Sequence, residues 1–136
     1  MFSVVINPLA NEDLTALRLS REQDDRTAAA LILVFLEQLQ EDQYLLDSLT
    51  IHEFADDNID VEHFASLWRL GYNLWRLKLA KLKEFNLQYR IIYAFEPLIN
   101  RYHILGIVHR NFKYDKNDPR TRKIIAAYDE LSIKRY

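Results

Sequence analysis

The sequence of 136 residues has no cysteine and only two glycines. Without cysteine the chain can form no disulfide, no thiolate metal site and no thiolate nucleophile. Two glycines are too few for a glycine-rich phosphate loop, and neither the zinc-protease pattern HExxH nor the serine-hydrolase pattern GxSxG occurs. These absences exclude most of the enzyme classes that short motifs identify.

Long apolar runs are missing as well. The longest, Ala28 to Leu36, falls short of the roughly 20 residues that span a bilayer, and MFSVVINPLA lacks the basic start of a secretory signal. We therefore expect no membrane association and, given the lack of cysteine, a cytoplasmic protein. Hydrophobic residues make up 49% of the sequence and aromatic residues 12%, so we expect a single domain over residues 1–136 with its own core.

Charge is sharply separated along the chain although the net charge is only -2. From Met1 to Trp68 three basic residues stand against fourteen acidic ones, a balance of -11. From Arg69 to Lys123 thirteen basic residues stand against four acidic ones, a balance of +9. We expect a polyanion to bind the second half. A second interpretation is that the two halves attract each other in the folded protein.

The first part of the chain has the pattern of a strand followed by helices. A β-branched run, Val4 to Ile6, ends at the turn signal Asn7–Pro8. Asn11 can cap a helix that begins near Glu12. A longer helix is predicted over Asp24 to Asp42, where neither glycine nor proline interrupts the pattern. The residues expected on the inner face of this helix are Leu31, Val34, Phe35, Gln38 and Leu39.

Most of the acidic residues are expected in an extended helical region at about residues 24–66. Within it the polar sequence ADDNID, Ala55 to Asp60, predicts a loop or turn before another short helix. The residues expected on the inner side of that helix are His63, Phe64, Leu67 and Trp68.

After Gly71 the hydrophobic period changes to two, the spacing of a β-strand. The stretch NLWRLKLAK alternates apolar with basic residues, and QYRIIYAFEP and RYHILGIVHR are rich in strand-forming residues. Three strands with short connections make an antiparallel meander. Asp118–Pro119 then starts a helix that continues to about Ser132. The chain is thus predicted to be α+β, with an N-terminal strand and helices packed on an antiparallel β-meander and a C-terminal helix.

Basic side chains and a phenol accompany these strands. Neighbouring strands lie about 5 Å apart, so side chains on the same face can converge on one ligand. Guanidinium groups bind phosphate oxygens, and histidine or tyrosine can move a proton, which are the parts needed for metal-free RNA cleavage. No two histidines have the i, i+4 spacing of a zinc motif, so we predict no metal site. The set consists of Arg76, Lys78, Lys81, Lys83, Arg90, His109, Arg110, Lys113 and Tyr114.

The segments LWRLKL, QYRIIYAFEP and YHILGIVHRNFKY resemble the strands of the RelE/ParE family of bacterial toxins. The resemblance covers roughly Trp68 to Tyr114. It implies the toxin of a type II toxin–antitoxin system, a metal-independent endoribonuclease that cuts messenger RNA at the ribosome and inhibits translation. It implies no cofactor, and its partners would be a cognate antitoxin, messenger RNA and the ribosome. No oligomeric state is indicated.

The same resemblance implies roles for individual residues. Arg90 would bind and stabilise the scissile phosphate, and Lys78 would contact phosphate or assist proton removal. Arg110 would add charge stabilisation. His109 or Tyr114 would be the general acid, or Tyr114 would stack on a base. The residues expected to bind RNA are Arg76, Lys81, Lys83 and Lys113.

Two other functions fit the same residues. One is a ParE-like inhibitor of DNA gyrase that does not hydrolyse RNA. The other is a non-catalytic module whose basic face binds an acidic protein. The sequence also leaves the strand register open, and a slip of one residue would turn Lys78 or Arg90 to the other face of the sheet.

Overall fold

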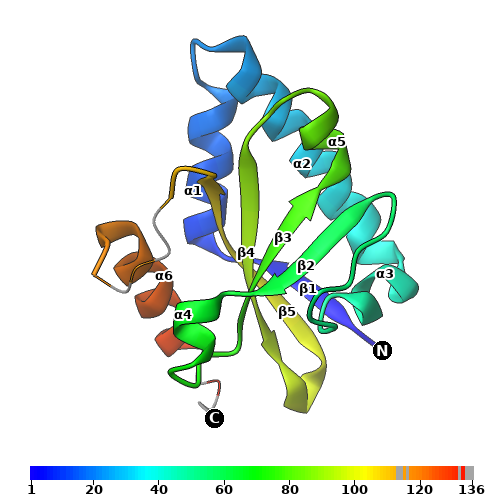
Figure 1. The fold of residues 1–136 in the computed structure, drawn as a ribbon, viewed down its shortest axis with the longest axis vertical. Helices are drawn as coiled ribbons and strands as arrows, with labels where there is room; N and C mark the ends of the chain where they lie inside the picture. The colour runs from blue at the N-terminus through cyan, green and yellow to red at the C-terminus, as the bar shows by residue number, and fades with distance from the viewer. Residues whose placement is uncertain (113–114, 116, 132, 134–136) are drawn as a thin grey trace.

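The computed structural model describes residues 1–112, 115, 117–131 and 133. Within this range the chain is α+β, with six α-helices and a five-stranded mixed sheet (Figure 1). The strands are β1 (Ser3–Ile6), β2 (Ile59–His63), β3 (Leu74–Leu79), β4 (Tyr89–Glu96) and β5 (Arg101–His109). The helices are α1 (Pro8–Arg18), α2 (Gln23–Glu41), α3 (Gln43–Ser48), α4 (Ala65–Trp68), α5 (Ala80–Glu84) and α6 (Pro119–Glu130), with a 3₁₀ turn at Pro97–Ile99.

The strands follow the order β1-β5-β4-β3-β2 across the sheet. β3, β4 and β5 form the predicted antiparallel meander. The turns before β4 and β5 contain Asn86 and Asn100 at φ of 56° and 49°, a left-handed conformation that asparagine tolerates. β1, however, pairs with β5 in parallel. The sheet is therefore mixed and not purely antiparallel, because β1 runs in the same direction as its neighbour β5 while every other neighbouring pair is antiparallel.

β2 is a strand that the sequence patterns do not predict. The sequence predicts an extended helical region at about residues 24–66, but after α2 and α3 the chain forms β2, which pairs antiparallel with β3. Its five residues are IDVEH, and the first four alternate between buried and half-buried. So short an alternation, next to a polar loop, is too weak a pattern to predict a strand. The short helix predicted after that loop is α4, and His63 belongs to the strand before it.

Two helices begin with the same cap. The Asn7 side chain accepts a hydrogen bond from Leu9 N at 2.9 Å, so α1 begins at Pro8, earlier than the predicted cap at Asn11. The Asp118 side chain accepts one from Arg120 N at 2.8 Å, and the predicted start of α6 is confirmed. In both cases proline occupies the first helical position, where no backbone N–H is required.

The inner face of α2 agrees only in part with the predicted one, because Leu39 is buried and Leu31 and Phe35 pack against the core. Val34, expected inside, is 53% exposed. The run from Ala28 to Leu36 is apolar all round, so the helical period alone does not select a face. The helix packs on the sheet through the face that carries Ala28 and Ala29, whose small side chains allow the helix to approach the strands closely. The buried residues of α2 are Ala28, Ala29, Ile32, Leu36 and Leu39.

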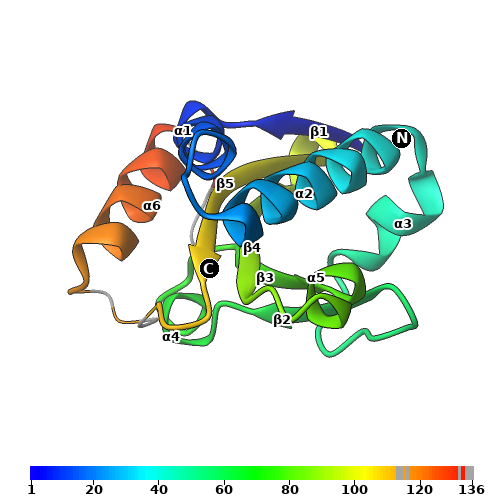
Figure 2. The same ribbon diagram turned by 90° about the horizontal axis from the view of Figure 1, so that it is seen from above.

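Both faces of the sheet carry a core, but they are covered to different extents. α1 and α2 lie on one side of the sheet and α4 on the other (Figure 2). On the α2 side Trp75, Leu77 and Leu79 of β3 join the larger cluster, whereas Leu74 joins a smaller cluster with α4 and α6. Arg76 and Lys78 follow Leu74 on that second face and are half-buried. None of the helices in the described part of the chain has the length and hydrophobicity to cross a membrane.

Asp13 of α1 ties two helices to β5. It lies beside a β-bulge, where the pairing of Ile92 with Gly106 is followed by that of Tyr93 with Ile104. Its carboxylate accepts a hydrogen bond from Ile107 N at 2.8 Å and forms an ion pair with Arg120 of α6. Burial raises the pKa of Asp13, against the opposing effects of these two partners.

We predict that Asp13→Ala lowers the free energy of unfolding by about 2 to 3 kcal/mol, because the N–H of Ile107 and the Arg120 guanidinium lose their acceptor. Glu12→Ala, at the exposed neighbouring position, should change it by less than about 0.5 kcal/mol. Urea denaturation followed by circular dichroism measures both. Equal stability of the two variants would show that Asp13 does not hold α1 and α6 to the sheet.

Candidate functional site

Three cations predicted to act on RNA share one face of the sheet. Arg76 and Lys78 alternate along β3 with residues of the main core. Leu77 pairs with Ile91, so Lys78 and Arg90, the next residues in opposite directions, lie at the same level on the other face. This register settles which side of the sheet they occupy. We call Arg76, Lys78 and Arg90 the basic row.

Lys78 lies close to the positive charges of Arg76, Arg90 and Lys83. Its pKa is lowered, first by burial and then by the charges of Arg76 and Arg90, with a further contribution from Lys83. Asp60 acts in the opposite direction. A lowered pKa increases the fraction of neutral amine near neutral pH, and a neutral amine can accept a proton.

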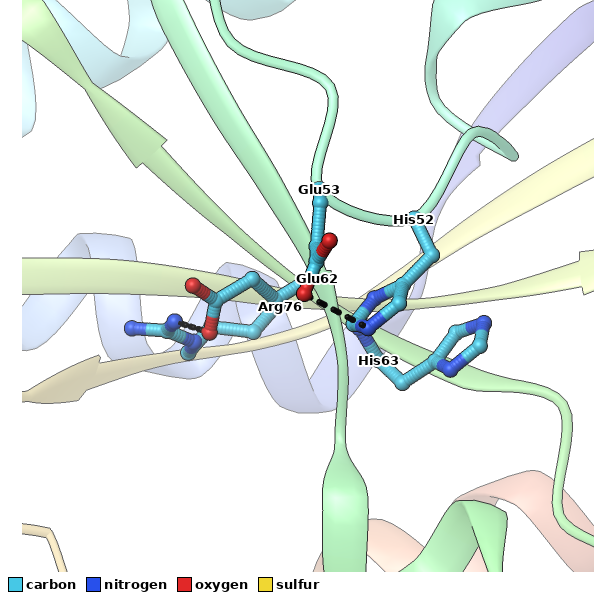
Figure 3. A network of polar contacts seen from close by, with 5 residues as sticks. All are labelled: His52, Glu53, Glu62, His63 and Arg76. Carbon is cyan, nitrogen blue, oxygen red and sulfur yellow. Dashed lines mark hydrogen bonds and ion pairs between the residues drawn. The ribbon is translucent and has the colours of Figure 1, made fainter.

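β2 brings carboxylates against the basic row. Glu62 pairs across the strands with Arg76, and Asp60 pairs with Lys78. Glu62 also forms an ion pair with the Arg76 guanidinium (Figure 3). The separation of charge along the sequence therefore has a structural basis in part, since the acidic half supplies direct partners for the basic half.

Lys81 and Lys83 lie on α5, directly after β3, and both are exposed. Lys83 is close enough to lower the pKa of Lys78. Lys81 forms an exposed ion pair with Glu84, with 3.9 Å between nitrogen and oxygen. Both lysines line a groove of about 1390 Å³ between α5, α2 and α3. Lys83 thus adds positive charge near Lys78, and Lys81 is paired with Glu84 in the same groove.

His109 lies on the other side of the sheet from Arg90. It pairs with Tyr89, whereas Arg90 pairs with Val108, so the two side chains point to opposite faces. Its imidazole meets the Tyr89 ring edge-on, with 5.3 Å between ring centroids. Arg110 follows at the exposed end of β5, where its N–H donates to Gln88 O at 2.6 Å. Lys113 and Tyr114 lie outside the described residues.

A second polar cluster surrounds His109, and the sequence patterns do not indicate it. The Asp25 carboxylate accepts hydrogen bonds from the hydroxyls of Ser20 and Tyr89, both at 2.6 Å. These bonds lower the pKa of Asp25, with a smaller contribution from His109. Burial and the bond to Asp25 raise the pKa of Tyr89 to about 12. Asp25 and Tyr89 are 64 positions apart, so only the folded chain brings them together.

Stacked aromatic rings stand at the end of β2. The His52 and His63 rings are nearly parallel with centroids 4.0 Å apart, and His63 stacks on Trp68 at 3.6 Å. His52 Nδ1 accepts a hydrogen bond from His63 N at 3.1 Å, and Figure 3 shows the two imidazoles side by side. These contacts hold the loop before β2 against the strand.

His63 should make stability dependent on pH. Burial and His52 lower its pKa below the usual value near 6.5, so the fold favours neutral imidazole. The stabilisation is then complete above the unfolded pKa and is lost as pH falls through the lower folded pKa. We predict that the free energy of unfolding decreases on acidification from about pH 7 to about pH 5, and less steeply in His63→Phe. Chemical denaturation over this range measures both slopes, and equal slopes would contradict the prediction.

No protein-family model matches the chain, and no curated protein matches it. A fold by itself hosts many functions, so the function has to be inferred from the residues of the site. Of the sequence-predicted set, the structure brings together Arg76, Lys78, Arg90 and Lys83, and it places His109 on the other side of the sheet.

Proposed function

We propose that the protein is a toxin of the RelE/ParE type, a metal-independent endoribonuclease that binds RNA on the basic row. The observation that carries the proposal is the position of Lys78 among Arg76, Arg90 and Lys83, with a lowered pKa. A lysine whose pKa is lowered among other cations is typical of a site that binds or transforms an anion. The resemblance of three segments to RelE/ParE strands supports the proposal, because these segments include β3, β4 and β5.

The chemistry needs no protein nucleophile. The ribose 2′-hydroxyl attacks the adjacent phosphorus, the 2′-oxygen–phosphorus bond forms, and the bond from phosphorus to the 5′-oxygen breaks. Neutral Lys78 accepts the proton of the 2′-hydroxyl, and Arg90 binds the phosphate oxygens, on which negative charge increases. The products are a 2′,3′-cyclic phosphate and a 5′-hydroxyl.

The departing 5′-oxygen must take up a proton. His109 is poorly placed to provide it, because it lies against Tyr89 on the face opposite Arg90. The proposal therefore assigns the general acid to Tyr114, in keeping with the resemblance, and assigns charge stabilisation to Arg110 at the end of β5. His109 belongs instead with Asp25 and Tyr89.

The proposed activity implies messenger RNA, the ribosome and an antitoxin as partners, and the cytoplasm as the place of action. Cleavage of messenger RNA at the ribosome takes place in the cytoplasm, and a toxin of this kind requires an antitoxin that keeps it inactive. An acidic antitoxin segment would complement the same cations that bind RNA.

A ParE-like inhibitor of DNA gyrase is the second candidate. The placement of His109 away from the basic row favours it, because a protein that only binds needs no proton donor beside the phosphate site. The two candidates differ in whether RNA is cut.

We predict that expression in bacteria stops growth and cuts transcripts, and that Arg90→Ala abolishes both effects because the scissile phosphate loses its bidentate ligand. Growth curves and mapping of RNA ends measure the outcome. Arg69→Ala, an exposed arginine outside the basic row, is the control and should remain toxic.

Intact transcripts on expression of the unchanged protein would contradict the ribonuclease proposal. If growth stops while transcripts stay intact, a DNA supercoiling assay with purified gyrase decides in favour of the second candidate.

Lys78→Arg separates binding from proton transfer. Arginine keeps the positive charge but stays protonated, so it cannot accept the 2′-hydroxyl proton. We predict that RNA affinity changes by less than about threefold while the single-turnover cleavage rate falls by roughly 100-fold or more. An unchanged cleavage rate would show that Lys78 only contacts phosphate.

A further inference from the structure

Glu62 of β2 neutralises one cation of the basic row, Arg76. Its carboxylate is ion-paired with the Arg76 guanidinium across the two strands. The Arg76 side chain is 15% exposed and that of Glu62 is 41% exposed. The carboxylate is thus the more accessible of the two groups, and an anion arriving from solvent competes with it for the guanidinium.

The two sides of the basic row differ in charge. On the β2 side Asp60 stands opposite Lys78 and Glu62 opposite Arg76. On the β5 side, Val108 stands opposite Arg90, and this residue carries no charge. A phosphodiester strand is therefore repelled by the carboxylates on the β2 side, whereas Val108, a buried core residue, adds no charge on the other side.

We propose that Glu62 is a specificity-determining residue of the basic row, an internal competitor that keeps Arg76 from binding RNA phosphate. Arg90 and Lys78 then make the primary contacts. This inference rests on the proposed binding of RNA. The sequence pattern groups Arg76 with the RNA-binding residues. Arg76 has a different role instead, as the ion-pair partner of Glu62.

Binding of RNA to the purified full-length protein tests this assignment. The probe is a short fluorescein-labelled single strand with 2′-O-methyl riboses, which cannot be cleaved, and the readout is fluorescence anisotropy. We expect Glu62→Gln to bind about fivefold more tightly than the unchanged protein, the scale of a partly exposed ion pair. The slope of log affinity against log salt should steepen by about 0.7, the contribution of one added phosphate contact to a single strand.

Two comparisons isolate the role of Arg76. Glu37→Gln makes the same change in net charge on an exposed position of α2 and should leave affinity unchanged within about twofold. Arg76→Gln alone leaves the Glu62 carboxylate without its partner and should weaken binding less than Arg90→Ala does, whereas in the Glu62→Gln background it should remove the whole gain. Thermal unfolding of each variant shows that it is folded before its affinity is compared.

The outcomes separate this inference from the proposed function. If Arg90→Ala weakens binding but Glu62→Gln binds no more tightly than Glu37→Gln, the carboxylate does not compete and the inference is overturned. A loss of affinity in Arg76→Gln alone, as large as in Arg90→Ala, overturns it as well. If Arg90→Ala and Lys78→Ala bind RNA like the unchanged protein, it is the proposed function that fails.

Discussion

The basic row depends on one constraint, the register between β3 and β4. Pairing of Leu77 with Ile91 places both in the core beneath α2, and it thereby fixes Lys78 and Arg90 on the opposite face. A slip of one residue would turn apolar side chains to solvent and cations into the core. Burial of unpaired charge is strongly unfavourable, so the packing of the apolar face determines where the charges lie.

The sequence allows two interpretations of its charge separation, namely that the basic half binds a polyanion and that the two halves attract each other. The structure contains features that fit each of them. β2, from the acidic half, places Asp60 and Glu62 beside Lys78 and Arg76. Farther away, Asp13 pairs with Arg120, which again joins the two halves. Arg90 stands beyond the carboxylates of β2, with Val108 on its other side. Attraction between the halves thus accounts for part of the positive charge, and the clustering of Arg76, Lys78 and Arg90 on one face supports the proposed binding of an anion.

The sheet also separates two chemical environments. On one face burial and the neighbouring cations lower the pKa of Lys78. On the other, near the same end of β4, Tyr89 donates to Asp25 beside His109, and its pKa is raised to about 12. A phenol with so high a pKa is a weak acid at neutral pH, which fits a structural role that anchors the start of α2 to the sheet. Adjacent residues of one strand, Tyr89 and Arg90, thus serve different purposes because they point to opposite faces.

The sequence by itself determined the three meander strands, the long helix and the cap of α6, because these are local patterns of period, propensity and capping. It also identified the cations of the basic row, since Arg76 and Lys78 alternate with apolar residues in NLWRLKLAK and Arg90 lies in the strand pattern QYRIIYAFEP. Only the tertiary structure decided the inner face of α2, the parallel pairing of β1, the strand β2 and the placement of His109 away from Arg90. Each of these depends on a partner distant in the sequence, and a local pattern cannot specify which distant segment will pack against it.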